Sequence, residues 1–156
     1  MPTHYQSDTY EARHSIGYLM RRSATLMRQQ IETVFEGHGL TFMQWVSLLL
    51  IRDGLALTCA ELSREVGYDS GALTRMVDQL ESRGLVRRER QESDRRQLRL
   101  SLTPLGMSSL EELMPIVVGV VNRSTEPLST DELTQLTAML SKLVKHMEQM
   151  PQWGLG

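Results

Sequence analysis

The chain has 156 residues, 40% of them hydrophobic and 23% charged, and carries a net charge of −2 at pH 7. This composition excludes an intrinsically disordered protein and predicts a domain with a buried core. No apolar run approaches the roughly 18 residues that cross a bilayer, and the first residues lack the basic and apolar segments of a signal peptide. We therefore expect a cytoplasmic protein with no membrane partner. The single cysteine, Cys59, excludes an internal disulfide framework.

Capping boxes, in which a small oxygen-bearing residue stands three positions before a Glu or Gln, predict where the first helices begin. The box from Asp8 to Glu11 predicts a helix of about 28 residues that ends near Gly37. Thr41 with Gln44 begins a second helix. Thr58 with Glu61 begins a third, shorter helix.

A fourth helix is predicted over residues 70–83, joined to the third by a turn of about four residues, as in a helix-turn-helix. The period then changes from helical to alternating, which indicates strands over residues 85–90 and 98–102 with a polar turn from residue 91. These strands form a hairpin.

Two further helices follow, beginning at Thr103-Pro104 and at the capping box of Ser129. The predicted fold is mainly α with a small β-hairpin wing: a winged helix-turn-helix module with dimerisation helices from both termini. The expected organisation is a first dimerisation helix in residues 1–40, the winged helix-turn-helix module in 41–103 and C-terminal dimerisation helices in 104–150, intertwined as one unit. The leucine-rich faces of the terminal helices need a partner to cover them.

Charge is placed unevenly along the chain. Residues 83–99 hold seven arginines, three acidic residues and no lysine, a local charge of +4. Arginine offers a planar fork that suits phosphates and guanine edges. The segment therefore indicates a nucleic-acid partner despite the acidic total.

The fourth helix predicts contacts in the major groove, because small and polar residues cover the face opposite its apolar one. The candidates for base and phosphate contacts are Ser70, Gly71, Ala72, Thr74, Arg75 and Gln79. The hairpin supplies a second set for the minor groove, in which Asp94 is spaced to brace Arg96. That set is Arg88, Arg90, Asp94, Arg95 and Arg96. The alternative is a solvated helix face beside a solvated charge run.

The segment from Leu73 to Arg88, followed by Asp94-Arg95-Arg96 and residues 100–103, resembles the recognition helix and wing of the MarR-type regulators of bacteria. The similarity covers roughly residues 10–148. The resemblance implies a homodimer in which the first, fifth and sixth helices interlock and two winged modules straddle a palindrome in double-stranded DNA. It also implies base contacts from Arg75, minor-groove contacts from Asp94 and Arg96, and repression as the mode of regulation.

Members of that family commonly respond to a small aromatic carboxylate or phenol, bound between the dimer helices and the winged module. The matching candidates for binding this effector are Arg13, His14, Tyr18, His38, Met43 and Trp45. A cationic side chain suits the charge of such a ligand, and an aromatic or Met surface suits its ring. The alternative is that Met43 and Trp45 are core residues and Arg13 is solvated.

Other functions receive less support from the sequence. It contains no phosphate-binding loop, nucleophile elbow or short His spacing, so we expect no enzyme activity, catalytic residue, cofactor or metal site. A winged helix that binds only proteins is one alternative. Another is an oxidant-sensing regulator acting through Cys59, which lies at a helix start where the dipole favours a thiolate. Oxidant-sensing members of the resembled family are expected to carry their cysteine near the start of the first helix, where this chain has none.

Overall fold

The computed structural model describes residues 4–90 and 98–150, and the chain divides into two compact units after Val120. The first unit holds most of the elements, and α5 runs across the division. In chain order the elements are η1 (Ala12–His14), α1 (Ile16–Phe35), α2 (Phe42–Arg52), α3 (Cys59–Val66), α4 (Ser70–Ser82), β1 (Val86–Arg90), β2 (Leu98–Leu102), α5 (Pro104–Thr125) and α6 (Thr130–Gln149). The mainly helical fold with a hairpin wing is thus confirmed.

The first helix begins later than the sequence predicts. Its N-cap is Ser15, whose hydroxyl accepts a hydrogen bond from the Tyr18 amide at 3.3 Å. The predicted start at Asp8 is therefore wrong. Residues 4–14 are exposed, so extending the helix through them would bury no apolar surface that could offset the loss of chain entropy.

The other predicted helix starts are confirmed. Thr41, Thr58 and Ser129 each accept a hydrogen bond from the amide three residues on, and the Gln or Glu at that position bonds back to the cap amide. Helix α3 ends at Gly67, whose φ of 68° lies in the left-handed region that glycine adopts without strain. The turn between α3 and α4 is therefore encoded locally.

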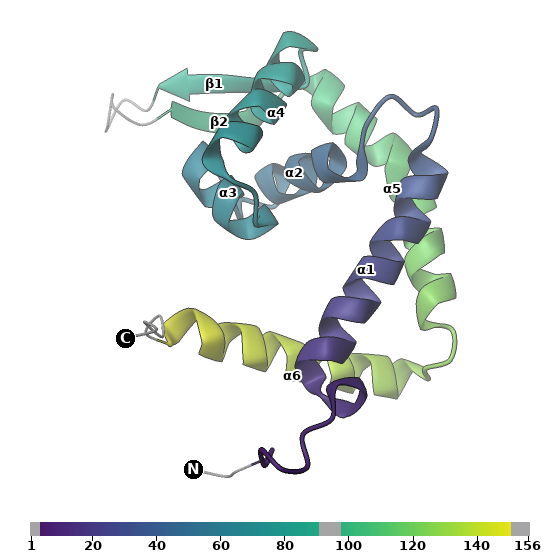
Figure 1. Cartoon of the computed structure of the whole chain (residues 1–156). Helices are drawn as coiled ribbons and strands as arrows, with labels where there is room; N and C mark the ends of the chain where they lie inside the picture. The colour runs from purple at the N-terminus through teal and green to yellow at the C-terminus, as the bar shows by residue number, and fades with distance from the viewer. Residues whose placement is uncertain (1–3, 91–97, 151–156) are drawn as a thin grey trace. The chain divides into compact units, whose positions relative to one another are not determined.

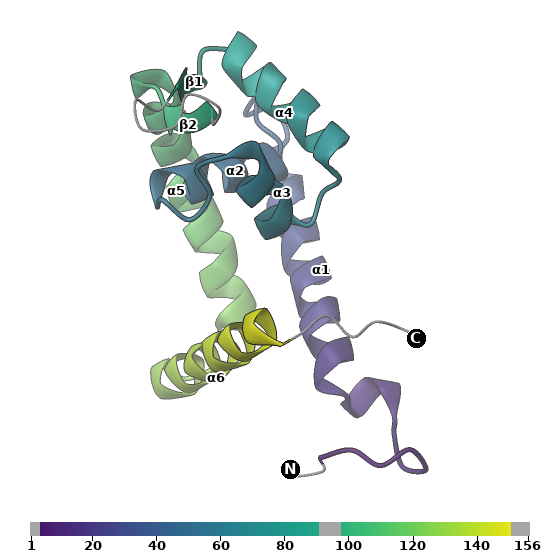
Figure 2. The same ribbon diagram turned by 90° about the vertical axis from the view of Figure 1, so that its left-hand side faces the viewer.

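The core of the first unit lies between α2, α3, α4, the hairpin and the first half of α5. It contains fully buried Leu48, Leu62, Leu73 and Leu80. Helix α4 packs against α3 and β1, and α2 packs against β2 (Figure 1). In both views the hairpin and α4 lie at one end of this unit, and the N-terminal half of α1 points away from them (Figure 2). This arrangement leaves the outer side of α4 accessible.

The hairpin is antiparallel, with Val86 opposite Leu102 and Arg90 opposite Leu98. Its inner edge is extended by a hydrogen bond of 2.7 Å from the Leu100 amide to the Leu57 carbonyl oxygen. The hairpin is thus anchored to the segment that precedes α3.

Among the described helices, α5 alone is long and apolar enough by length and composition to cross a bilayer. This corrects the expectation that no segment approaches that length. Leu110, Leu113 and Val117 bury their side chains within the protein. The side of α5 that carries these three residues packs on the core of the first unit.

The second unit contains α6, which has no buried residue. Its apolar side chains recur at spacings of three and four residues, the pattern of a helix that packs along a partner helix. They are Leu133, Leu136, Leu140, Leu143 and Met147, and we call this set the α6 stripe. Leu136 and Leu143 are each 38% exposed.

Candidate nucleic-acid interface

Helix α4 is capped by Asp69, a residue that the sequence pattern placed only in the turn before the helix. The Asp69 carboxylate accepts hydrogen bonds from the Gly71 and Ala72 amides at 3.0 and 2.9 Å. An Asp directly before a helix is itself a signal of an N-cap, so this residue was predictable. A DNA phosphate at this end would have to compete with the carboxylate for those amides.

The face of α4 opposite its apolar side is exposed, as the sequence predicts. Ser70, Gly71, Thr74, Arg75 and Gln79 are exposed, and Ala72 is half-buried. The Arg75 Nε donates a hydrogen bond of 3.3 Å to the Gly71 carbonyl oxygen, which lays the side chain along the helix. Among the described residues its two Nη groups have no partner, so they are available to a base edge.

Gln79 has a second function within the fold. Its Oε1 accepts a hydrogen bond of 3.4 Å from Nε2 of Gln44, which is buried in α2. The amide NH₂ of Gln79 remains a donor for DNA. Gln79 thus ties α4 to α2 as well as lying on the exposed face.

The wing residues divide into three groups. Arg90 is exposed at the end of β1. Arg88 is turned inward, where its Nη2 lies 2.6 Å from Oδ1 of Asp78 and its Nη1 bonds to Oε2 of Glu81. The remaining predicted wing residues, Asp94, Arg95 and Arg96, lie outside the described residues.

The pKa of Arg88 reflects this environment. Partial burial lowers it, but the hydrogen bonds with Asp78 and Glu81 together outweigh burial and hold the pKa above the usual value for arginine. The guanidinium is therefore fixed in its charged form between two carboxylates of α4.

The predicted effector residues fall into two separate groups within one chain. Arg13 and His14 lie in η1, directly before α1, and Tyr18 lies in the first turn of α1, whereas His38 follows the end of that helix. A helix of 20 residues, as α1 is, spans roughly 30 Å at 1.5 Å per residue. A single chain therefore does not bring the two groups together.

The side chains in these two groups differ in exposure. His14 is exposed and its Nδ1 lies 2.8 Å from Oε2 of Glu11. In α2, Met43 is half-buried, and Trp45 is 3% exposed with its Nε1 donating to the Leu110 carbonyl oxygen at 3.1 Å. Of the predicted set, Trp45 is thus fully engaged in the core.

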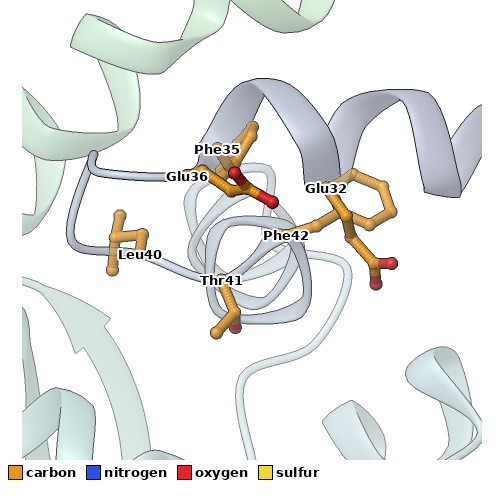
Figure 3. Close-up of a pocket in the computed structure, with 6 residues that line it drawn as sticks. All are labelled: Glu32, Phe35, Glu36, Leu40, Thr41 and Phe42. Atoms are coloured by element: carbon orange, nitrogen blue, oxygen red, sulfur yellow. The ribbon is translucent and has the colours of Figure 1, made fainter.

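A pocket of about 280 Å³ lies at the junction of α1 and α2 (Figure 3). Phe35 and Phe42 contribute an edge-to-face ring pair with centroids 6.2 Å apart, and the carboxylates of Glu32 and Glu36 are also part of the lining. None of the predicted effector residues lines it. An aromatic carboxylate in this pocket would be repelled by both glutamates, so its charge does not suit the predicted effector.

Cys59 is half-buried as the first residue of α3. Its thiol is one of the smaller influences that raise the pKa of Arg88, after Asp78 and Glu81. In the described part of the chain, no group of three or more His, Cys, Asp or Glu is placed to hold a metal ion.

The chain is similar to known regulators of transcription. Residues 38–97 match the model of the MarR family. The organic hydroperoxide resistance transcriptional regulator of Bacillus subtilis is 28% identical over 142 residues, which cover 91% of this chain and 95% of the relative.

Solved structures of MarR family proteins share the fold of this chain. A cysteine-to-serine variant of Escherichia coli MarR in complex with operator DNA superposes with a TM-score of 0.71 at 28% identity, covering 88% of this chain and 99% of that one. A MarR family protein of Mycobacterium tuberculosis in complex with p-aminosalicylic acid gives a TM-score of 0.70 at 26% identity, covering 83% and 98%.

Proposed function

Because this chain belongs to the MarR family of transcriptional regulators, we propose that it is a sequence-specific repressor that binds a palindromic operator as a homodimer. The observation that carries this proposal is the exposed face of α4, where Arg75 is held by one hydrogen bond to its own helix and keeps both Nη groups free among the described residues. Arginine with two free Nη groups is suited to the O6 and N7 edge of guanine. The likeness to a DNA-bound relative supports the same role for α4.

The module in residues 41–103 is assigned to DNA binding. The exposed Ser70, Gly71, Thr74 and Gln79, with Ala72, are assigned to the major groove beside Arg75. Arg90 is assigned to the minor groove, together with Asp94, Arg95 and Arg96 from the sequence between the two strands.

Residues 1–40 and 104–150 are assigned to dimerisation. The exposed apolar side chains of α6 support this assignment, because such a stripe is stable in water only when a partner covers it. Two copies related by a two-fold axis present two α4 helices to two half-sites. The bound dimer occludes the promoter, which is how repression follows from binding.

We assign the effector site to the dimer rather than to one chain, since a second copy is needed to join the two separated groups of effector residues. A small aromatic acid or phenol is the proposed ligand, and the complex of a relative with p-aminosalicylic acid supports that class. Binding between the copies would change the spacing of the two α4 helices and release the operator.

The test is selection of binding sites from random double-stranded DNA, followed by titration of the selected site with salt and with salicylate. We expect a palindromic consensus and an affinity that falls steeply with salt, because several phosphates are neutralised. Salicylate should lower the affinity, and cyclohexanecarboxylate, an acid of similar size with no aromatic ring or phenolic hydroxyl, should not. Recovery of no consensus would contradict the proposal and favour a winged helix that binds proteins.

A second candidate is a regulator that senses oxidants through Cys59, favoured by the similarity to the hydroperoxide regulator. Its test compares the wild type with Cys59→Ser in operator binding before and after treatment with an organic hydroperoxide. Loss of binding in the wild type alone would support this candidate. Equal behaviour of both proteins would leave Cys59 as a packing residue.

A further inference from the structure

Arg88 lies on the inner side of the hairpin. Side chains alternate along a strand, so Arg88 shares a face with Val86 and with its cross-strand neighbour Leu100, which are both 1% exposed. The Arg88 side chain is 19% exposed, whereas that of Arg87, on the outer face, is 59% exposed. The strand period therefore directs Arg88 toward the protein.

The Arg88 side chain bridges two acidic residues of α4. Its Nη2 lies 2.6 Å from Oδ1 of Asp78, and its Nη1 bonds to Oε2 of Glu81. The Arg88 backbone amide also donates to Oε1 of Glu81 at 3.2 Å. Glu81 thus binds both the side chain and the backbone of Arg88, and the three residues form what we call the Arg88 clamp.

The clamp connects the two parts of the module assigned to DNA. Asp78 and Glu81 are three residues apart and lie on one side of α4, and Asp78 is itself three residues after Arg75. A shift of α4 relative to the hairpin would change where Arg75 meets a base. Two hydrogen bonds from one rigid guanidinium oppose that shift.

The clamp also changes the charge of this surface. Without Arg88, Asp78 and Glu81 would present two negative charges beside DNA phosphates. The Asp78 side chain is 56% exposed, so its negative charge would repel the phosphates of a bound duplex. Arg88 offsets one of those charges and holds both carboxylates toward the hairpin.

We infer that Arg88 is a positioning residue for DNA recognition: it locks α4 to the wing through Asp78 and Glu81 instead of contacting DNA itself. The inference rests on the proposed DNA-binding function. It revises the assignment of Arg88 from the sequence, which grouped this residue with the candidates for minor-groove contacts.

The two roles predict different effects of substitution. Lysine can make a phosphate contact nearly as well as arginine. When one phosphate contact is lost, the negative slope of log affinity against log salt becomes shallower by about 0.9. A positioning arginine cannot be replaced by lysine, since an ammonium group does not match two carboxylates with a planar fork. Its loss lowers the specific affinity and leaves the salt slope unchanged.

The experiment measures affinity for the selected site and for unrelated DNA over a salt series, using the wild type, Arg88→Lys, Arg88→Gln and Arg87→Gln. In both Arg88 variants we expect the ratio of specific to non-specific affinity to fall about tenfold or more, because hydrogen bonds between charged groups are stronger than those between neutral groups. We expect the dependence of affinity on salt to stay the same as in the wild type. Arg87→Gln is the matched control, because Arg87 pairs with Glu89 on the outer face and bonds to no described residue of α4. It should keep the wild-type ratio.

A double-mutant cycle with Asp78→Asn is a second test of the clamp. It compares the double variant with the single variants, so a general loss of stability in one variant does not decide the result. If Arg88 acts through Asp78, the pair Asp78→Asn with Arg88→Gln should be no worse in specific affinity than Arg88→Gln alone. Unfolding midpoints measured without DNA should show the same lack of additivity.

The inference would be overturned if Arg88→Lys kept nearly the wild-type ratio of specific to non-specific affinity and Arg88→Gln had a shallower salt dependence. Arg88 would then be a DNA contact. Strict additivity of the two substitutions would also overturn it. If the wild type selects no DNA sequence, the proposed function falls together with this inference, whereas selective binding that tolerates lysine at this position overturns the inference alone.

Discussion

The first turn of α5 passes so close to the start of the hairpin that no side chain fits at Gly106: a Cβ there would lie 2.0 Å from the carbonyl oxygen of Leu85. The Leu85 carbonyl also accepts a hydrogen bond from the Thr103 amide at 3.1 Å. The Gly106 amide in turn donates to Oγ1 of Thr103 at 3.0 Å. Close backbone contact thus joins α5 to the wing.

We predict that Gly106→Ala destabilises the protein by about 1–3 kcal/mol or more, because the obstructing atom is backbone and cannot rotate away. Thermal or urea unfolding measures the effect. Gly119→Ala is the control in the same helix: a Cβ at that position would meet no neighbouring atom within 4 Å, and alanine there should raise stability by about 0.5–1 kcal/mol. Equal stability of Gly106→Ala and the wild type would contradict the close contact.

Arg75→Ala should relax the base preference at one position of each half-site and cost about 1–3 kcal/mol for the preferred base. The reason is that its Nη groups, which have no partner in the part of the chain that the structure describes, are the donors of α4 best suited to a guanine edge. Binding-site selection with the variant measures the change. Arg28→Ala, in α1 and outside the winged module, is the control and should recover the wild-type consensus. An unchanged consensus for Arg75→Ala would remove that residue from the recognition surface.

Local signals in the sequence were sufficient for most of the fold. The capping boxes of Thr41, Thr58 and Ser129 depend on residues three positions apart, so they appear in the sequence and recur in the structure. The similar box at Asp8 failed because a cap stabilises a helix only where the following turns bury apolar surface, and residues 4–14 are exposed.

Contacts between distant elements were harder to predict. Arg88 faces inward because alternate residues of a strand lie on the same face, and Val86 is buried. Its partners Asp78 and Glu81 belong to another element, and no pattern in the neighbouring sequence identifies them. The effector residues were grouped by analogy, and the length of α1 separates them in one chain. The close approach of Gly106 to Leu85 depends on how α5 crosses the hairpin, which no local pattern records.

Acid should destabilise the protein partly through Glu61. Its carboxylate accepts hydrogen bonds from the Leu57 and Thr58 amides at 2.8 and 3.0 Å. The bond with the Leu57 amide, followed by those with Thr58, holds the pKa of Glu61 below its usual value of 4.5 although burial opposes the shift. A lowered folded-state pKa contributes stability above the unfolded pKa, and this contribution is lost as the pH falls through the folded value.

We therefore predict that the free energy of unfolding of the wild type falls more steeply below about pH 5 than that of Glu61→Gln. The amide of glutamine can still accept from the cap but does not titrate in this range. Chemical unfolding at a series of pH values measures the two slopes. Glu65→Gln, exposed on the same helix, is the control and should follow the wild type. Parallel curves for the wild type and Glu61→Gln would show that the cap does not depend on the charge.

Dimerisation should depend on the α6 stripe. Its members follow spacings of 3, 4, 3 and 4 residues from Leu133 to Met147, two heptads of the pattern by which helices pack along one another. A charge placed in the middle of a buried seam is left without water or a partner, so Leu143→Glu should convert the dimer to a monomer. Light scattering and sedimentation measure the mass. Ser141→Glu adds the same charge on α6 away from the stripe, and it should remain a dimer.

The same variant tests the coupling between dimerisation and DNA binding. A dimer engages two half-sites at once, so loss of the dimer should lower operator affinity at least about 100-fold and leave binding to a single half-site nearly unchanged. A Leu143→Glu protein that stays dimeric would show that the stripe is not the seam. One that becomes monomeric yet binds the full operator with wild-type affinity would show that the two winged modules act independently.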